Sequence, residues 1–266
     1  MSAFELSYAE GADGDDPSEP MASAAGGDAE TYPILSGVRR PVVVLVIGMA
    51  GAGKTTMMHR INLYMNEHAK RGYYINLDPA CRAVPFGANI DIRDTVNYRE
   101  VMKQYSLGPN GAILTCLNLF ATRFDQVVSL LERRADELDY IFIDTPGQIE
   151  AFTWSAGGKI ISELLATAFP TVILYVTDTQ RSASPTTFMS NMLYACSILY
   201  RSQLPMVCAF NKSDVVPSAV AEEWMRDFET YQQAVDGDKG EEYMGTFNRS
   251  LSLVLDEFYK CVIGRG

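Results

Sequence analysis

Residues 42–56 read Val-Val-Val-Leu-Val-Ile-Gly-Met-Ala-Gly-Ala-Gly-Lys-Thr-Thr, an apolar run that leads directly into the spacing G-x-x-x-x-G-K-T. Such a run predicts a buried β-strand, and the glycines after it let successive backbone N–H groups turn toward one phosphate. A helix that begins at Lys54 adds the positive end of its dipole. The stretch therefore predicts a phosphate-binding loop between a strand and a helix in an α/β protein.

The residues of this loop have distinct expected roles in holding a nucleotide. The backbone groups expected to surround the β-phosphate belong to Gly48, Gly51, Ala52 and Gly53. Lys54 would bring a positive charge to the β- and γ-phosphates, Thr55 a hydroxyl to Mg²⁺, and Thr56 a donor to the α-phosphate. The alternative is an ordinary glycine-rich turn, which neither the long apolar run nor the Lys-Thr pair favours.

Composition suggests one sizeable domain with an acidic tail. The chain has 266 residues, of which 47% are apolar, and a formal charge of −11. Eight acidic and no basic residues lie in residues 1–30, so the rest of the chain carries only −3 of that −11. Residues 1–36 are rich in small and acidic side chains and predict a disordered tail, followed by a folded domain over residues 37–266. The mild charge and the lack of a basic stripe argue against direct nucleic-acid binding.

Cysteine usage and hydropathy indicate a protein of the cell interior. The five cysteines form no C-x-x-C pair and are odd in number, which fits a reducing compartment better than a disulfide framework. The longest apolar stretch, residues 164–176, is interrupted by Pro170 and is too short to span a bilayer. We therefore expect a soluble intracellular protein with no membrane contact.

A carboxylate follows the next predicted strand, residues 73–77, in the sequence Asp78-Pro79-Ala80. The carboxyl ends of strands are where α/β folds collect their ligands. Asp78 could orient a water on Mg²⁺ or beside the γ-phosphate, or it could simply begin an Asp-Pro turn. The sequence leaves both interpretations open.

A second carboxylate ends the predicted strand 140–143, in the sequence Asp144-Thr145-Pro146-Gly147-Gln148. In P-loop proteins an aspartate at this position holds Mg²⁺ through water, and a glycine N–H like that of Gly147 senses the γ-phosphate. Gln148 stands where an amide can position water. Glu150 is a weaker candidate, since its side chain could simply be solvated.

The sequence Asn211-Lys212-Ser213-Asp214 follows a predicted strand at 206–210. An aspartate in N-K-x-D accepts hydrogen bonds from the guanine ring N1–H and 2-amino group, while the lysine stem lies along the base. Such a site rejects adenine because the carboxylate would be left unpaired. The alternative is a polar loop, which three nucleotide motifs in the correct order make the weaker interpretation.

The remaining patterns predict a further strand at 172–176 and a stiff turn at 107–111, where Pro109 fixes φ and Asn110 and Gly111 tolerate left-handed geometry. The helices predicted from apolar spacing cover residues 54–70, 97–105, 117–138, 188–200, 219–231 and 247–259.

Together the motifs resemble the GPN-loop GTPases over residues 42–259. The resemblance rests on the phosphate loop, L-D-P-A at 77–80, G-P-N at 108–110, D-T-P-G-Q-I-E at 144–150, the stretch 188–200 and N-K-S-D. It implies a P-loop NTPase fold, a three-layer α/β sandwich with a mostly parallel sheet, that hydrolyses GTP with Mg²⁺ as a homodimer or as a heterodimer with a paralogous GPN-loop GTPase.

The resemblance also implies how the site works. Asn110 of one subunit would reach the phosphates held by the other, doing with an amide what an arginine finger does with a charge. Asp78, Gln148 and Glu150 would hold the attacking water. The eukaryotic members that the chain resembles are tied to RNA polymerase II assembly and nuclear import, which implies polymerase subunits or assembly factors as partners and a cytoplasmic protein that could shuttle to the nucleus.

In one respect the sequence departs from the family. Past the helix at 247–259 the family continues into a strand, a loop that covers the guanine, and further helices, so the resemblance implies a C-terminally incomplete domain. Two other interpretations remain. A P-loop ATPase of the dimeric partitioning class would share the fold but has no use for N-K-S-D, and a nucleotide-binding scaffold would have no turnover.

Overall fold

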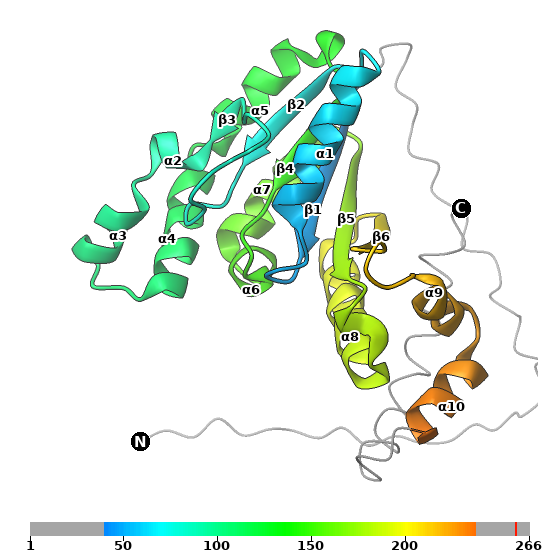
Figure 1. Cartoon of the computed structure of the whole chain (residues 1–266). Coiled ribbons are helices and arrows are strands. Elements are labelled where there is room, and N and C mark those ends of the chain that lie inside the picture. Colours follow the sequence, from blue (N-terminus) through cyan, green and yellow to red (C-terminus); the bar gives the residue numbers. More distant parts are fainter. Residues whose placement is uncertain (1–39, 238–258, 260–266) are drawn as a thin grey trace, which may run out of the picture. The chain divides into compact units, whose positions relative to one another are not determined.

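The computed structural model describes residues 40–237 and Tyr259. Six strands, all paired in parallel, form one sheet in the order β3-β2-β4-β1-β5-β6 (Figure 1). The strands are β1 (Val42–Gly48), β2 (Gly72–Asn76), β3 (Ile90–Asp91), β4 (Tyr140–Asp144), β5 (Thr171–Asp178) and β6 (Met206–Asn211). The predicted tail at 1–36 lies outside the described residues, as do the predicted helix at 247–259 apart from Tyr259 and the expected end of the domain.

The order of the strands places β1 at the centre of the site. The chain runs from β1 to one side for β2, β3 and β4, then returns to the other side for β5 and β6. Val46 of β1 therefore pairs in register with Asp144 of β4, and Gly48 with Val176 of β5. This reversal creates a crevice beyond the carboxyl ends of the strands, the place where open α/β sheets bind ligands.

Alternating side chains of β1 face two separate cores, which gives the molecule its three layers. Val43, Leu45 and Ile47 belong to the large core with buried side chains of α4 (Pro109–Ala121), α5 (Phe124–Arg133), α7 (Ala156–Ala168) and α8 (Pro185–Ser202). Val44 and Val46 belong to a smaller core with Met58 and Met65 of α1 (Lys54–Glu67). The alternation is the period of two that a strand buried on both faces requires. The predicted parallel α/β P-loop fold is confirmed.

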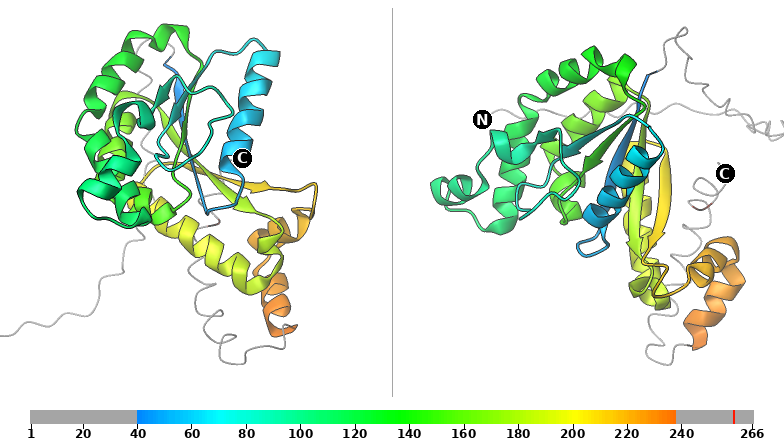
Figure 2. Two further views of the ribbon diagram at one scale, coloured as in Figure 1. Left: turned by 60° about the vertical axis from the view of Figure 1, so that its left-hand side comes forward. Right: turned by 45° about the horizontal axis from the view of Figure 1, so that its top comes forward.

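The shorter elements cover the ends of the sheet and the outer helices. They are α2 (Ile92–Thr95), α3 (Tyr98–Gln104), α6 (Ile149–Thr153), α9 (Ala219–Arg226), α10 (Phe228–Gly237) and the 3₁₀ turns η1 (Ala135–Glu137) and η2 (Arg181–Ala183). Figure 2 shows α9 and α10 beside the end of α8. An aromatic cluster joins them, because Phe188 of α8 lies 5.3 Å from Trp224 and 5.8 Å from Tyr231, ring centroid to ring centroid. Among the described residues, no helix has the length and apolar content needed to cross a membrane.

The prediction of a turn at 107–111 is wrong. Gly108 is the N-cap of α4 with an extended backbone (φ −71°, ψ 171°), and Pro109 is the first residue of the helix. A proline restricts the residue before it to extended geometry, while its own φ suits the first helical turn, where its missing N–H costs nothing. Asn110 and Gly111 therefore take helical rather than left-handed geometry.

Two of the predicted long helices are broken. The segment 117–138 divides into α4, α5 and η1, because the Thr122 hydroxyl donates to the Leu119 carbonyl (2.7 Å) and Arg123 leaves helical geometry. The break lets Phe124 turn into the core. The segment 219–231 also divides, at Asp227, whose carboxylate accepts hydrogen bonds from the Glu229 N–H and the Thr230 hydroxyl. Local side-chain bonds to the backbone compete with the helix in both places.

Candidate nucleotide-binding site

The carboxyl ends of five neighbouring strands bring the predicted motifs to one edge of the sheet. Asn76 of β2 pairs in register with Asp144 of β4, and Asp178 of β5 pairs with Asn211 of β6. The phosphate loop leaves β1 between these two pairs. Motifs whose contacting residues are up to 161 positions apart in the sequence are therefore neighbours in space, as the parallel sheet predicts.

The phosphate loop is already curved. Gly51 and Gly53 have φ values of 82° and 93°, a left-handed geometry that glycine adopts without steric cost. Lys54 folds back over the loop, where its Nζ donates to the carbonyls of Gly48 (2.8 Å) and Met49 (3.4 Å). Only 6% of Lys54 is exposed, and burial lowers the pKa of its ammonium group, against the opposing effect of two nearby carboxylates.

Asp144 and Thr55 form a site that fits Mg²⁺. The Thr55 hydroxyl donates to Asp144 Oδ2 (2.9 Å), while the buried Oδ1 accepts no hydrogen bond from any described residue. Burial raises the pKa of Asp144 to about 6, although Thr55 and Lys54 work in the opposite direction. A buried carboxylate oxygen without a partner beside a hydroxyl offers the hard oxygen ligands that Mg²⁺ prefers.

The segment after Asp144 lies over the phosphate loop. The Thr145 hydroxyl donates to the Val46 carbonyl (2.7 Å), which ties the start of this segment to β1. A Cβ placed on Gly147 would lie 3.6 Å from Cβ of Ala50 in the loop. Gly147 is therefore close to the position that the sequence assigns to the terminal phosphate.

The N-K-S-D segment is joined directly to the phosphate loop. Asn211 Nδ2 donates to the Ala52 carbonyl (2.8 Å), and Lys212 Nζ donates to the Gly51 carbonyl (2.9 Å). A Cβ on Gly53 would collide with the Asn211 amide, so glycine is required there for space as well as for φ. The N-K-S-D segment and the phosphate loop thus form one hydrogen-bonded unit.

Asp178 is a site residue to which the sequence analysis assigned no role. Its Oδ2 lies 2.7 Å from Lys212 Nζ and 3.7 Å from Arg181 Nε, and the residue is buried. Burial favours the neutral acid, but the hydrogen bond from Lys212 and the backbone bonds after it outweigh burial and hold the pKa of Asp178 below its ordinary value. The available signal was its position at the end of a strand, which also marked Asp78 and Asp144.

The predicted catalytic residues are only partly brought together. Gln148 Nε2 donates to Asn110 Oδ1 (2.6 Å) within the same chain. Asp78 is half-buried beside Lys54, and burial raises the pKa of its carboxyl, against the opposing effects of a hydrogen bond from the Ala80 N–H and the charges of Lys54 and Arg93. Three other predicted residues are exposed, and their side chains make no hydrogen bond or ion pair with another described site residue: Thr56, Glu150 and Asp214.

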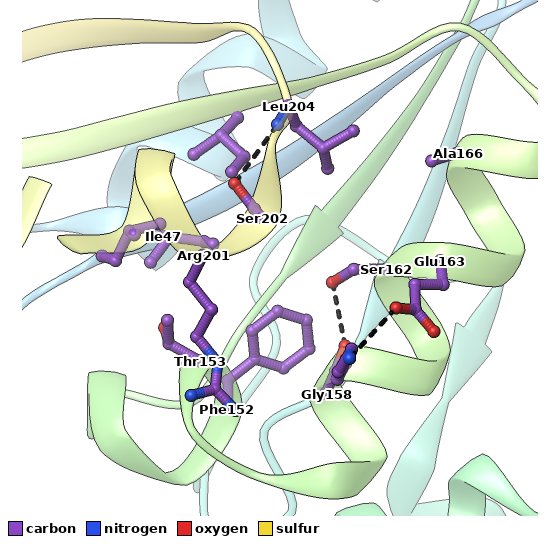
Figure 3. Close-up of a pocket in the computed structure, with 13 residues that line it drawn as sticks. Ile47, Phe152, Thr153, Gly158, Ser162, Glu163, Ala166, Arg201, Ser202 and Leu204 are labelled. Atoms are coloured by element: carbon purple, nitrogen blue, oxygen red, sulfur yellow. Dashed lines mark hydrogen bonds and ion pairs between the residues drawn. The ribbon is translucent and has the colours of Figure 1, made fainter. Parts of the chain in front are cut away.

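A separate small pocket lies between α6, α7 and α8 on the large-core side of the sheet. Its lining residues include Phe152, Gly158, Ser162, Arg201 and Leu204, which Figure 3 draws as sticks. None of the predicted nucleotide-binding residues lines this pocket. The lining residue nearest to them in the sequence is Ile47, which precedes Gly48. The pocket is therefore distinct from the phosphate loop.

The chain is a P-loop nucleotide-binding protein. It has a curved phosphate loop, a carboxylate at a strand end that is bonded to Thr55, and an N-K-x-D segment bonded to the same loop. Comparison with known proteins agrees. A family profile described as "Conserved hypothetical ATP binding protein" matches residues 46–264. GPN-loop GTPase 1 of Dictyostelium discoideum is 60% identical over 221 residues, which are 83% of this chain and 55% of that protein.

A more distant relative, of known structure, matches over more of its own length. A GPN-loop GTPase of Pyrococcus abyssi is 31% identical over 188 residues, 71% of this chain and 74% of that protein. The crystal structure of a P. abyssi GTPase in its apo form has a TM-score of 0.68 and 28% identity, covering 81% of this chain and 85% of that one. This chain belongs to the GPN-loop GTPase family. It spans 55% to 62% of the length of the first four eukaryotic relatives.

Proposed function

We propose that this chain binds GTP with Mg²⁺ and hydrolyses it to GDP and phosphate. The observation that carries the proposal is the pair of hydrogen bonds from Asn211 and Lys212 to the phosphate loop. These bonds fix the spacing between a loop that suits phosphates and a carboxylate, Asp214, that suits guanine. An ATPase of the partitioning class has no need for that connection, so guanine is the favoured base.

The residues divide the work of binding as follows. The loop amides and Lys54 hold the phosphates, and Lys54 must leave the Gly48 carbonyl to reach them. Asp144 and Thr55 would hold Mg²⁺, which, when bound, neutralises charge that develops on the phosphate oxygens. Gly147, beside the loop, would donate its N–H to the γ-phosphate.

The polar side chains at the mouth of the site would hold and orient the attacking water. Asp78 faces Lys54 from the end of β2, and Gln148 begins the segment that leads into α6. Both can accept a hydrogen bond from a water and so orient it toward the γ-phosphate. Glu150 is a third candidate for this role. In phosphoryl transfer a protein contributes mainly positioning and electrostatic stabilisation, and little covalent chemistry.

A finer proposal concerns assembly. Following the family resemblance, we propose that the GTP cycle operates in a homodimer or in a heterodimer with a paralogue, that Asn110 of one subunit acts at the site of the other, and that the cycle is an assembly and nuclear-import switch for RNA polymerase II in the cytoplasm and nucleus. Support comes from the motifs at 108–110 and 188–200 that carry the resemblance. Depletion of the protein should leave polymerase subunits in the cytoplasm, and their normal nuclear import would contradict this role.

Base specificity is the sharpest test of the main proposal. The unmodified chain should bind GTP at least about a hundredfold more tightly than ATP, because adenine leaves Asp214 unpaired. In Asp214→Asn, the amide loses one acceptor and gains a donor, so affinity should move from GTP toward xanthosine triphosphate, whose 2-position is a carbonyl. Asp125→Asn, an exposed aspartate on α5, is the matched control. Equal affinity for ATP and GTP would overturn the proposal.

Turnover separates an enzyme from a scaffold. A single-turnover measurement with excess protein should convert bound GTP to GDP in the presence of Mg²⁺. Tight GTP binding with no GDP formed would leave only the scaffold interpretation.

A further inference from the structure

Behind Asp78 lies a network of polar side chains that none of the nucleotide motifs includes. At its centre is Asn76, the last residue of β2, which is only 1% exposed. Its Oδ1 accepts a hydrogen bond from the Asp78 N–H (3.1 Å), and its Nδ2 donates to the Asp78 carbonyl (3.2 Å). One buried amide thus binds both backbone groups of Asp78 and fixes the direction in which that residue leaves the sheet.

The network is anchored on the neighbouring strand. Asn76 Nδ2 also donates to Asp91 Oδ1 (3.0 Å), at the end of β3. Arg93 holds the Asp91 carboxylate from the other side, with its Nε 3.0 Å from Oδ1 and its Nη2 2.7 Å from Oδ2. Such two-pronged arginine–carboxylate contacts are the geometrically most specific of ion pairs. Asp91 is thereby kept charged and oriented toward Asn76, and its pKa lies below the ordinary value although burial acts against this.

The same arginine reaches the loop itself. Arg93 Nη1 donates to the carbonyl of Cys81 (3.3 Å), and the Cys81 thiol donates to the Asp78 carbonyl (3.1 Å). Asp78 Oδ1 in turn accepts from the Ala80 N–H (2.9 Å), so the loop 78–81 is fixed on both sides. A free Asp-Pro turn would need none of these contacts.

We infer that Asn76, Asp91 and Arg93 are positioning residues that hold Asp78 at the correct place for GTP hydrolysis. The inference rests on the proposed function and deepens it. It says that the chain fixes the position of Asp78 for catalysis, whereas a simple Asp-Pro turn would leave that position unsupported. Water must be placed to within a fraction of an ångström for an in-line attack, and a carboxylate on an unsupported loop would not do this. The charge of Arg93 also favours the ionised form of Asp78.

The first test uses Asn76→Ala in the full 266-residue chain. We expect kcat for GTP hydrolysis to fall about ten- to a hundredfold while KM changes less than about threefold, because the Asn76 side chain bonds to the loop 78–81 and to Asp91 and to neither the phosphate loop nor the N-K-S-D segment among the described residues. In the double variant Asn76→Ala/Asp78→Ala, kcat should equal that of Asp78→Ala alone, since Asn76 acts through Asp78. A fully multiplicative loss in the double variant would overturn the inference.

The second test does not depend on turnover, so it separates this inference from the proposed function. Hydrogen exchange of the Ala80 N–H, which is bonded to Asp78, should become about tenfold faster in Asn76→Ala. If the unmodified chain hydrolyses no GTP, the proposed function fails, whereas unchanged Ala80 exchange means that the network does not hold the loop.

A milder variant covers the case in which Asn76→Ala does not fold. Arg93 is partly exposed, and Arg93→Gln should lower kcat about three- to tenfold with the melting temperature nearly unchanged. The matched control is Arg71→Gln, because Arg71 also pairs with an aspartate, Asp139, but at the amino ends of β2 and β4. Equal kcat in Arg93→Gln and Arg71→Gln would overturn the inference.

Discussion

The phosphate loop and the G-P-N segment both carry residues by which the family is identified, yet the chain holds them in different ways. The phosphate loop is bonded to β6 through Asn211 and encloses the buried Lys54. The G-P-N segment is exposed at the start of α4, and its functional amide has one exposed side-chain bond, from Gln148. An exposed hydrogen bond contributes about 1 kcal/mol, so another group can replace it easily. The first region is prepared by its own chain, whereas the second is open at the surface.

The largest expected effect falls on the prepared region. Lys54→Ala should raise the Kd for GTP by more than about a thousandfold, because it removes a buried positive charge that the loop would present to the β- and γ-phosphates. Isothermal titration calorimetry in Mg²⁺ measures it, with the exposed Lys159→Ala as the control. Unchanged affinity would mean that the loop does not bind phosphates in the proposed way.

Asn110→Ala should have a smaller effect of a different kind. The amide carries no full charge, so its removal should lower kcat about ten- to a thousandfold, while the Kd for GTP changes little. Steady-state kinetics together with calorimetry separates the two quantities. A loss of affinity as large as that in Lys54→Ala would make the G-P-N segment part of the binding site, and the contrast between the two regions would disappear.

Mixing subunits tests whether Asn110 serves its own site or that of a partner. In a mixed dimer of Asn110→Ala and Lys54→Ala subunits, one site combines an intact phosphate loop with an intact partner Asn110, so activity should partly return. If the contact with Gln148 inside one chain is the functional one, activity stays absent. Native mass spectrometry must confirm that mixed dimers form.

The prepared region is the one that the sequence predicts best. The glycine spacing before Lys54, the apolar strand before Asp144 and the order of the motifs all depend on local sequence, and the parallel sheet then brings the strand ends together. Contacts between the motifs are not local. The bond from Asn211 to Ala52 spans 159 residues, and no spacing rule gives it.

Two features of the candidate site were not predicted correctly, for identifiable reasons: the part that Asp178 plays and the local geometry of the G-P-N segment. Asp178 follows an apolar strand without a recognised motif, so its pairing with Lys212 was visible only once β5 and β6 were known to be neighbours. The G-P-N segment was predicted as a turn because proline, asparagine and glycine all favour turns. The same proline also suits the first turn of a helix, and the apolar residues of α4 that enter the large core decide between the two.

A third effect concerns the stability of the prepared region without ligands. Burial raises the pKa of Asp144 from 3.8 to about 6, so this carboxyl ionises at a higher pH in the folded protein than in the unfolded chain. As pH rises through that window, the free energy of unfolding should fall, because the unfolded chain ionises first. At pH 7.5 without Mg²⁺ or nucleotide, Asp144→Asn should therefore raise the free energy of unfolding by roughly 1–3 kcal/mol.

Denaturant titrations of Asp144→Asn and the unmodified protein at pH 7.5 and near pH 3.5 provide the comparison. The difference between the two proteins should be present at pH 7.5 and nearly absent at the lower pH, where the carboxyl is protonated in the folded state and mostly protonated in the unfolded chain. A variant that is less stable at pH 7.5 would show that the buried carboxylate is compensated by contacts within the chain, contrary to the orphaned Oδ1.

The smallest effect tests what makes the open region rigid. Pro109 is exposed at the first position of α4, where its fixed φ suits the helix and no N–H is needed. Pro109→Ala should lower the free energy of unfolding by only about 0.4–1 kcal/mol, chiefly by giving the unfolded chain more freedom. If the helix positions Asn110, kcat should change less than about twofold, because alanine continues the same helix. Thermal melts and kinetics of the same sample measure both. A fall in kcat as large as that of Asn110→Ala would mean that the proline ring, and not α4, aims the amide at the nucleotide.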